Sequence, residues 1–331
     1  MTAPVELRPY QLLCLVCARG HELVEGPRAV TVADTLRLIR EYPDRPVMLR
    51  ANAHDAYAYQ DPGDCQDIDG SPEFNRKRDL DILAALDLPP GVVLPARTLL
   101  HRVIKAVPTV AGICGYETRT SEAWVGCPRS LEGHYEAGFA AGIDALIPPR
   151  EAEELARDKE ASVAALESGG PLRIRPHVIM CAVCNYGTND GCSEPLAADN
   201  IVEFIELIRR DPQAPVVMAE GADWMICAPC PKRVAELNAC VNVAGSGGLS
   251  NEKRDLDLLQ VLGLTYETSI PARYLLALIF SRVPDTSTVC RRDHPPLSVW
   301  WDGCGESNRV AGNSGYTRGR ALLVEQLRLT V

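Results

Sequence analysis

Five cysteines in the second half of the chain have the residue type and spacing of metal ligands. Cys227 and Cys230 form a Cys-x2-Cys pair, which places two sulfurs within ~4 Å across one tight turn and suits zinc or an iron–sulfur cluster. Pro229 and Pro231 restrict this turn, so less conformational entropy is lost when a metal binds. The full set could supply four thiolates with one thiol to spare: Cys227, Cys230, Cys240, Cys290 and Cys304.

The uneven spacing of these thiols bears on the identity of the metal. Zinc sites usually show two close pairs of ligands and often include histidine, whereas here one close pair is joined by single, widely spread cysteines. This pattern favours an iron–sulfur cluster, [4Fe–4S] rather than [2Fe–2S], and zinc stays open as the alternative.

Two further Cys-x2-Cys pairs occur near the start of each half of the chain. Both pairs end apolar runs, Gln11–Cys17 and Val178–Cys184, that have the length of a buried strand. We expect these thiols either to be redox-active or cluster-binding at the carboxyl end of a strand, or to pack in the core. The ligand candidates of lower rank are Cys14, Cys17, Cys65, Cys114, Cys127, Cys181 and Cys184.

The composition excludes several classes of protein. With 331 residues, 46% of them hydrophobic, the chain reads as an ordinary globular protein, and no apolar run reaches the ~18 residues of a membrane helix. The net charge of −10 argues against nucleic acid as a partner. Thirteen cysteines, an odd number, without a secretion signal argue against a disulfide framework and favour a cytoplasmic location. We expect a redox protein as partner; the oligomeric state is not predicted.

An internal repeat divides the chain. Asn75–Pro108 aligns without gaps to Asn251–Pro284 with 16 of 34 positions identical, against about two expected from average residue usage. The similarity extends in both directions, so that Cys14, Cys17, Cys114 and Cys127 match Cys181, Cys184, Cys290 and Cys304. We expect a first repeat at residues 1–149, a helical linker at 150–170, and a second repeat with the cysteine-rich metal site at 171–331.

Each repeat carries the same order of expected elements. A helix (Val32–Glu41; Asn200–Arg210) precedes a strand (Pro46–Leu49; Pro215–Met218), which predicts a strand–helix–strand unit with parallel strands. Leucines at helical spacing then predict a core-facing helix, and Arg78-Asp79 and Arg254-Asp255 are expected on its exposed face or in an ion pair between domains. The predicted fold is α/β and helix-rich: two tandem copies of a small domain with a short parallel sheet, related by a pseudo-twofold axis.

The second half also resembles a known family. It has Arg175-Pro176-His177 with Cys181, then Glu220-Gly221-Ala222-Asp223 running into Cys227-Ala-Pro-Cys230-Pro231, and later Cys240, Lys253-Arg254-Asp255, and Cys290 with Trp300, Trp301 and Cys304. This pattern resembles the small bacterial and archaeal family catalogued as domain of unknown function 1284, and the resemblance implies an iron–sulfur cluster. One departure is Asp293, which stands where the late loop of the family carries a second cysteine.

The first half departs further from that pattern. Tyr59 and Pro62 stand where Cys227 and Cys230 stand in the second half, while Cys65, Cys114 and Cys127 are kept. We favour a degenerate first copy that supports the second. Two alternatives remain: a separate cluster held by Cys65, Cys114, Cys127 and one thiol of the opening pair, or a substrate pocket in place of a cluster.

These patterns predict a function class but no reaction. We expect an iron–sulfur protein with a role in electron transfer or as a redox accessory. The alternatives are a zinc-stabilised interaction module without turnover, and a metal- or thiol-dependent enzyme whose site lies between the two halves. No catalytic residue is identified, so whether the protein is an enzyme stays undecided.

Overall fold

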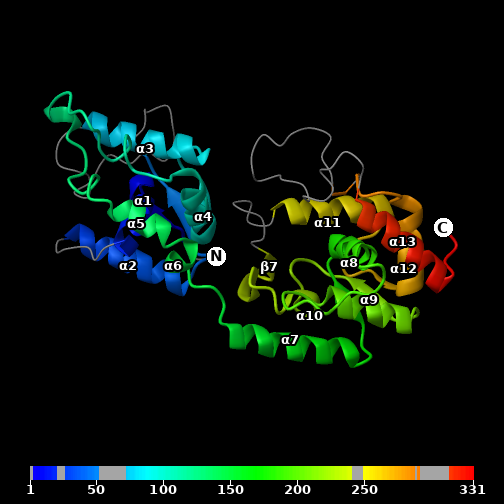
Figure 1. Cartoon of the computed structure of the whole chain (residues 1–331). Coiled ribbons are helices and arrows are strands. Elements are labelled where there is room, and N and C mark those ends of the chain that lie inside the picture. The colour runs from blue at the N-terminus through cyan, green and yellow to red at the C-terminus, as the bar shows by residue number, and fades with distance from the viewer. Residues whose placement is uncertain (1–2, 21–26, 52–71, 241–248, 288, 291–312) are drawn as a thin grey trace. The chain divides into compact units, whose positions relative to one another are not determined.

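The computed structural model describes residues 3–20, 27–51, 72–240, 249–287, 289–290 and 313–331. It divides into two compact units, Met1–Pro149 and Arg150–Val331 (Figure 1). Both are rich in helices and contain small sheets, which confirms the helix-rich α/β class. Candidate ligands Cys65 and Cys304, and also Tyr59, Pro62, Asp293, Trp300 and Trp301, lie outside the described residues.

The first unit is built on a three-stranded sheet. Its strands β1 (Val5–Leu7), β2 (Pro46–Leu49) and β3 (Val93–Pro95) lie in that order, with β1 parallel and β3 antiparallel to β2. The parallel pair needs a crossover, which α1 (Pro9–Gly20) and α2 (Pro27–Glu41) supply. The expected parallel strands are therefore present, in a sheet that is mixed.

The remaining helices of the first unit pack around α1. They are α3 (Pro72–Leu86), α4 (Ala96–Ala106), α5 (His134–Ala140) and α6 (Ile143–Leu146), with a 3-10 turn η1 (Glu122–Trp124) before α5. The core residues of α1, including Leu12, Leu13 and Val16, are completely or almost completely buried. Figure 1 shows α1 among α2, α4 and α5.

The second unit repeats this arrangement. Strands β4 (Leu172–Ile174), β5 (Pro215–Met218) and β8 (Ser269–Pro271) form a sheet with the same order and the same strand senses. Helices α8 (Pro176–Thr188) and α9 (Ile201–Arg210) make the crossover. Helices α11 (Leu249–Leu262), α12 (Ala272–Arg282) and α13 (Ser314–Leu327) complete the core, in which α8 contacts α9, α11 and α13.

The second unit also contains four short elements and one long helix. Helix α7 (Ala152–Glu167) falls in the segment expected as a linker and packs against α9 and α10. Helix α10 (Trp224–Cys227) leads into a hairpin of β6 (Arg233–Val234) and β7 (Ala239–Cys240), whose connection contains a 3-10 turn η2 (Ala235–Leu237). These short elements carry three of the candidate ligands.

The prediction that the opening cysteine pairs end strands was wrong. Cys14 and Cys17 lie in α1, and Cys181 and Cys184 lie in α8. A proline begins each of these helices, where its missing N–H leaves no donor unpaired. Because α1 is surrounded by other helices, most of its sides are apolar, and such a run cannot be told from a buried strand by periodicity.

A close contact joins α1 to α5. At Gly20 an added Cβ would lie 1.8 Å from the backbone oxygen of His134, and at Gly138 it would lie 2.0 Å from that of Val16. No side chain fits at either position, so α1 and α5 meet backbone to backbone. This contact fixes the face of α1 that carries the thiols relative to α5.

The prediction that Arg78-Asp79 and Arg254-Asp255 lie on an exposed face or pair between domains was also wrong. Asp79 and Asp255 are fully buried, and each pairs with an arginine of its own unit. The core-facing stripe of α3 runs through Asp79, Ile82, Leu83 and Leu86, which leaves Leu80 exposed. A carboxylate can therefore occupy a core position when an arginine pairs with it. The spacing of the leucines alone predicts an apolar side chain at such a position.

Candidate metal centre

The Cys227–Cys230 pair lies at the end of a capped single-turn helix. Asp223 accepts a hydrogen bond from the backbone N–H of Met225 at 2.9 Å and so caps α10, whose last residue is Cys227. The backbone N–H of Cys230 donates to the carbonyl of Cys227 at 3.0 Å, which closes the turn between the two thiols. The sequence therefore folds locally as a Cys-x2-Cys metal site requires.

The hairpin brings a third cysteine to this turn. Cys240 pairs with Arg233 across β6 and β7, and Arg233 lies only three residues after Cys230. Asn238 forms the sharp turn in left-handed backbone conformation, and its carbonyl accepts from the N–H of Ala222 at 2.7 Å. The loop before α10 and the hairpin after it are thus held together.

The three thiols act on one another electrostatically. The pKa of Cys227 is raised to about 12: burial raises it most, Arg175 lowers it, and the neighbouring thiols of Cys240 and Cys230 raise it. Burial raises the pKa of Cys230 as well, with a further contribution from Cys240. These shifts favour the protonated form of Cys227 and Cys230, and a bound cation is what would favour the thiolates.

A buried arginine supplies positive charge to this group. Burial lowers the pKa of Arg175, but Asp255 and the thiols of Cys240 and Cys227 more than offset this, so that its pKa is raised overall. Asp255 holds the guanidinium through Nε at 2.8 Å and Nη2 at 2.6 Å. A fixed cation beside several thiols suits a centre whose ligands carry negative charge.

Two further residues hold the site in place. Arg150 donates from Nη1 to the carbonyls of Ala228 at 2.8 Å and Cys230 at 3.2 Å, and its Nη2 lies 2.6 Å from Glu154 of α7. Asn251 of α11 donates from Nδ2 to the sulfur of Cys240 at 3.8 Å. The site is thus supported from α7 on one side and from α11 on another.

Cys290 lies in a different thiol group. The thiols of Cys184 and Cys290 both raise the pKa of Tyr316 in α13, whose largest shift comes from burial. Asn313 donates from Nδ2 to the sulfur of Cys184 at 3.2 Å. Cys290 is therefore grouped with Cys184 of the opening pair, through their shared effect on Tyr316, and not with Cys227.

The cysteines of the first unit group in the same way. From the sequence, the alternative site joined Cys114 and Cys127 to Cys65 and to only one thiol of the opening pair. Cys14 and Cys127 raise the pKa of Cys17, and Cys14, Cys127 and Cys17 raise that of Cys114, in both cases after the larger effect of burial. Both members of the opening pair therefore act on Cys114, and Cys17 also interacts with Cys127. The repeat offset, which matches these four to Cys181, Cys184, Cys290 and Cys304, was the signal that could have revealed this group.

The donor set fits a thiophilic metal, but the sulfurs are not in ligating positions. Within the described parts of the chain, no three His, Cys, Asp or Glu side chains are arranged to hold a metal ion. No disulfide joins the described cysteines, as metal binding requires. Cys192, on an exposed turn, belongs to neither thiol group of the second unit by sequence match and serves as a control residue.

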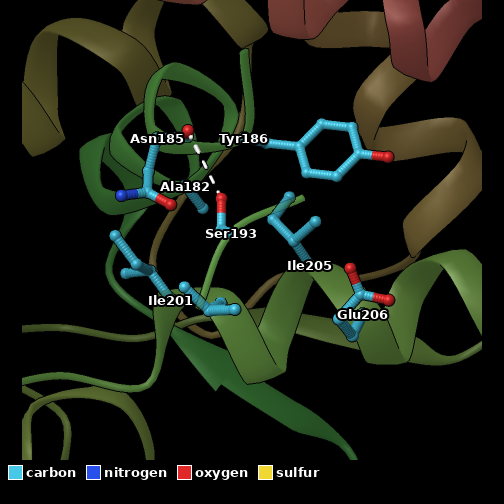
Figure 2. Close-up of a pocket in the computed structure, with 8 residues that line it drawn as sticks. Ala182, Asn185, Tyr186, Ser193, Ile201, Ile205 and Glu206 are labelled. Atoms are coloured by element: carbon cyan, nitrogen blue, oxygen red, sulfur yellow. Dashed lines mark hydrogen bonds between the residues drawn. The ribbon is translucent and has the colours of Figure 1, made fainter. Parts of the chain in front are cut away.

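A small pocket in the second unit is lined by none of the candidate metal ligands. It is narrow and is lined mainly by side chains of α8 and α9, among them Tyr186, Ile205 and Glu206 (Figure 2). Ser193 closes one side and donates to the carbonyl of Asn185 at 3.4 Å. Its lining is largely apolar and contains no cysteine, so it adds no ligand to the candidate centre.

Comparison with known proteins adds no assignment to this geometry. Among the described helices, none combines the length and the apolar character needed to cross a bilayer. No protein-family model, no curated protein and no solved structure matches the chain.

Proposed function

We propose that this protein binds an iron–sulfur cluster through thiolates of its second unit, and that Cys227, Cys230 and Cys240 are ligands. The observation that carries the proposal is the hairpin pairing of Cys240 with Arg233, which brings this cysteine to the Cys-x2-Cys turn. To ligate, the three sulfurs have to turn toward a common centre by changes of side-chain rotamer. The sequence offers Cys290 or Cys304 as the fourth ligand, and we propose Cys304, because Cys290 contributes to the thiol group around Tyr316 instead.

The surroundings of these thiols favour a cluster. A cluster with four thiolates is a negatively charged centre, and the buried Arg175 guanidinium beside Cys227 and Cys240 offsets that charge. The hydrogen bond from Asn251 to Cys240 is of the kind that tunes a cluster's reduction potential. The role that follows is electron transfer or a redox accessory function, with a redox protein as partner and a cytoplasmic location, where thiols stay reduced.

A zinc-stabilised module is the second candidate, and one observation favours it. The elements that carry the three cysteines are very short: α10 has four residues, and β6 and β7 have two each. Elements of this length have few hydrogen bonds of their own, and a structural zinc that joins them would contribute folding free energy. In that case the metal would have no redox role.

We also infer that the two units arose by duplication. Both have the same strand order and senses, and matched contacts recur at matched positions. These contacts are the hydrogen bonds from Tyr135 to Val107 and from Tyr316 to Val283, and the ion pairs Arg8–Asp79 and Arg175–Asp255. The resemblance to domain of unknown function 1284 and the pseudo-twofold relation belong to this proposal as predictions.

Anaerobic purification followed by metal and sulfide analysis tests the proposed function. We expect iron and acid-labile sulfide, with a broad visible absorption that dithionite bleaches, and a clear decrease of both in Cys230→Ser. Cys192→Ser changes another thiol of the same unit and is expected to keep the wild-type content. Stoichiometric zinc in a colourless protein would favour the zinc-stabilised module, and equal metal content in Cys230→Ser and wild type would refute both. Cys290→Ser and Cys304→Ser, measured in parallel, identify the fourth ligand.

A further inference from the structure

Four thiols of the first unit lie in one neighbourhood. Cys14 and Cys17 are three residues apart in α1, so they share one face of that helix, and both are partly buried. Together with Cys114 they pack against the core of the unit. Burial raises the pKa of Cys114 most, and Cys14, Cys127 and Cys17 each raise it further, so each of these three thiols lies within electrostatic range of Cys114.

The loop after α4 is folded so that its two cysteines meet. The backbone N–H of Cys127 donates to the carbonyl of Cys114 at 2.7 Å, and the hydroxyl of Ser130 donates to the carbonyl of Cys127 at 2.7 Å. Gly126 has a φ of +75°, and a Cβ there would lie 2.7 Å from the carbonyl oxygen of Cys114. Only glycine allows this close approach, so the loop conformation depends on residues flanking the thiols.

Helix α5 fixes this loop opposite the thiols of α1. Glu136 of α5 accepts from the hydroxyl of Thr109 at 2.7 Å and from the N–H of Val110 at 3.2 Å. The hydroxyl of Tyr135, also in α5, donates to the carbonyl of Val107 at 2.7 Å. Because α5 also meets α1 backbone to backbone at Gly20 and Gly138, the loop and α1 are held against the same helix.

Positive charge accompanies these thiols as it does the centre of the second unit. Burial raises the pKa of Cys114 and Cys17, while Arg78 lowers that of Cys114 and Arg129 lowers that of Cys17. Arg78 is itself buried, with its guanidinium 3.7 Å from the centre of the Tyr10 ring. Two guanidiniums beside four thiols provide the charge balance that a tetrathiolate centre needs.

The second unit preserves the core of this arrangement. Cys17 and Cys114 raise the pKa of Tyr135, and the matched residues Cys184 and Cys290 raise that of Tyr316, in both cases after burial. The sequence alignment and the structure therefore agree on which thiols belong together. In both units a thiol of a helix lies near a thiol of a distant loop. The packing of single buried cysteines does not require this recurrence.

We propose that Cys14, Cys17, Cys114 and Cys127 form a second centre for a thiophilic metal, zinc or an iron–sulfur cluster, in the first unit. This site goes beyond the proposed function because it uses other residues in another unit, and it takes both thiols of the opening pair. Four thiolates are a complete ligand set for either metal. The described sulfurs are not in ligating positions, so they have to turn toward a common centre by changes of side-chain rotamer as the metal binds. Each thiol gives up its proton as the metal binds.

Cobalt titration of the full-length chain tests this centre separately from the one in the second unit. The background variant Cys227→Ser/Cys230→Ser/Cys240→Ser removes the three second-unit ligands, and anaerobic, reduced protein is titrated with Co²⁺. We expect the visible absorption of tetrahedral Co²⁺–thiolate to persist in this background. Adding Cys17→Ser/Cys127→Ser is expected to weaken binding beyond the roughly 10–100-fold loss typical of changes to outer-shell partners, whereas adding Cys192→Ser is expected to leave it unchanged.

A measurement on unmutated protein guards against variants that fail to fold. Wild-type protein is alkylated with and without zinc, and the modified cysteines are mapped by mass spectrometry. Zinc is expected to slow alkylation of Cys14, Cys17, Cys114 and Cys127 together, relative to Cys192. Equal alkylation of these four thiols with and without zinc would overturn the second centre, and so would Co²⁺ binding that survives Cys17→Ser/Cys127→Ser in the background variant. Neither result bears on the centre at Cys227, Cys230 and Cys240.

Discussion

The buried guanidinium of Arg175 and the buried carboxylate of Asp255 form an ion pair with a closest distance of 2.6 Å. The other oxygen of Asp255 accepts from the backbone N–H of His177 at 2.9 Å and contacts Nδ1 of the same residue at 2.6 Å. Because an ionised carboxylate can only accept, this contact assigns the ring proton to Nδ1. One carboxylate on α11 thus holds the start of α8 and the arginine that faces the thiols.

Replacing this carboxylate is expected to destabilise the second unit strongly. Asp255→Asn leaves the Arg175 charge buried without its main partner, which typically costs about 3–5 kcal/mol of unfolding free energy. Asp257→Asn breaks an exposed pair with Lys253 on the same helix and is expected to cost at most about 1 kcal/mol. Urea unfolding of both variants measures the difference, and equal losses in the two would contradict the assigned role of Asp255.

Acidification is expected to weaken the second unit through His177. Burial lowers the pKa of His177 from 6.5; Asp255 opposes this shift, and Arg175 and Arg254 add to it. Below pH 6.5 the unfolded chain therefore binds more protons than the folded one, so the unfolding free energy falls as pH decreases. In His177→Gln that part of the decline is expected to be absent. Urea midpoints measured between pH 7 and pH 5 would refute this if the variant declined as steeply as wild type.

The contact between α1 and α5 predicts that Gly138 cannot be replaced by a residue with a side chain without loss of stability. A Cβ at Gly138 would lie 2.0 Å from the carbonyl of Val16, so Gly138→Ala has to push the two helices apart. We expect a loss of about 1–3 kcal/mol, as in other overpacked interiors. Gly170→Ala is the control, because the nearest atom to its Cβ is 3.8 Å away. Thermal unfolding of the two variants gives the comparison, and a Gly138→Ala protein as stable as the control would show that the contact is looser than described.

The hydrogen bond from Asn251 to Cys240 predicts a change in the metal centre without loss of a ligand. Asn251→Ala removes a donor to the sulfur, and changes of outer-shell partners typically weaken metal binding by about 10–100-fold. If the centre is a cluster, losing this donor also lowers its reduction potential. Metal affinity and the potential are measured against Asn189→Ala, whose amide contacts only the backbone of Asn185 among the described groups. Unchanged values in Asn251→Ala would remove Cys240 from the ligand set.

Much of the fold could be predicted from the sequence, because each element is expected once in each repeat and the two occurrences can be compared. Strands at Pro46–Leu49 and Pro215–Met218 were predicted with their observed bounds, since a short β-rich run after a proline-stopped helix leaves little choice. The opening runs were misassigned because α1 and α8 are apolar on most sides, which removes the periodicity that separates a buried helix from a buried strand. The buried ion pairs were missed because a charge in the core depends on a partner far along the chain.

The candidate sites were only partly predictable for a related reason. Local spacing was enough to join Cys227 and Cys230, and a short hairpin added Cys240. The place of Cys290 depends on the packing of α13 against α8, which puts Tyr316 beside Cys184 and Cys290. The spacing of residues along the chain does not reveal such tertiary contacts. Only the correspondence between the repeats could have indicated them.

X-ray absorption at the edge of the bound metal, on protein purified without oxygen, tests the central claim most directly. A sulfur shell near the ~2.3 Å typical of metal–thiolate bonds, reduced in Cys230→Ser and kept in Cys192→Ser, is the predicted result. A metal surrounded only by nitrogen and oxygen, or protein that contains no metal after anaerobic purification and reconstitution, would contradict it.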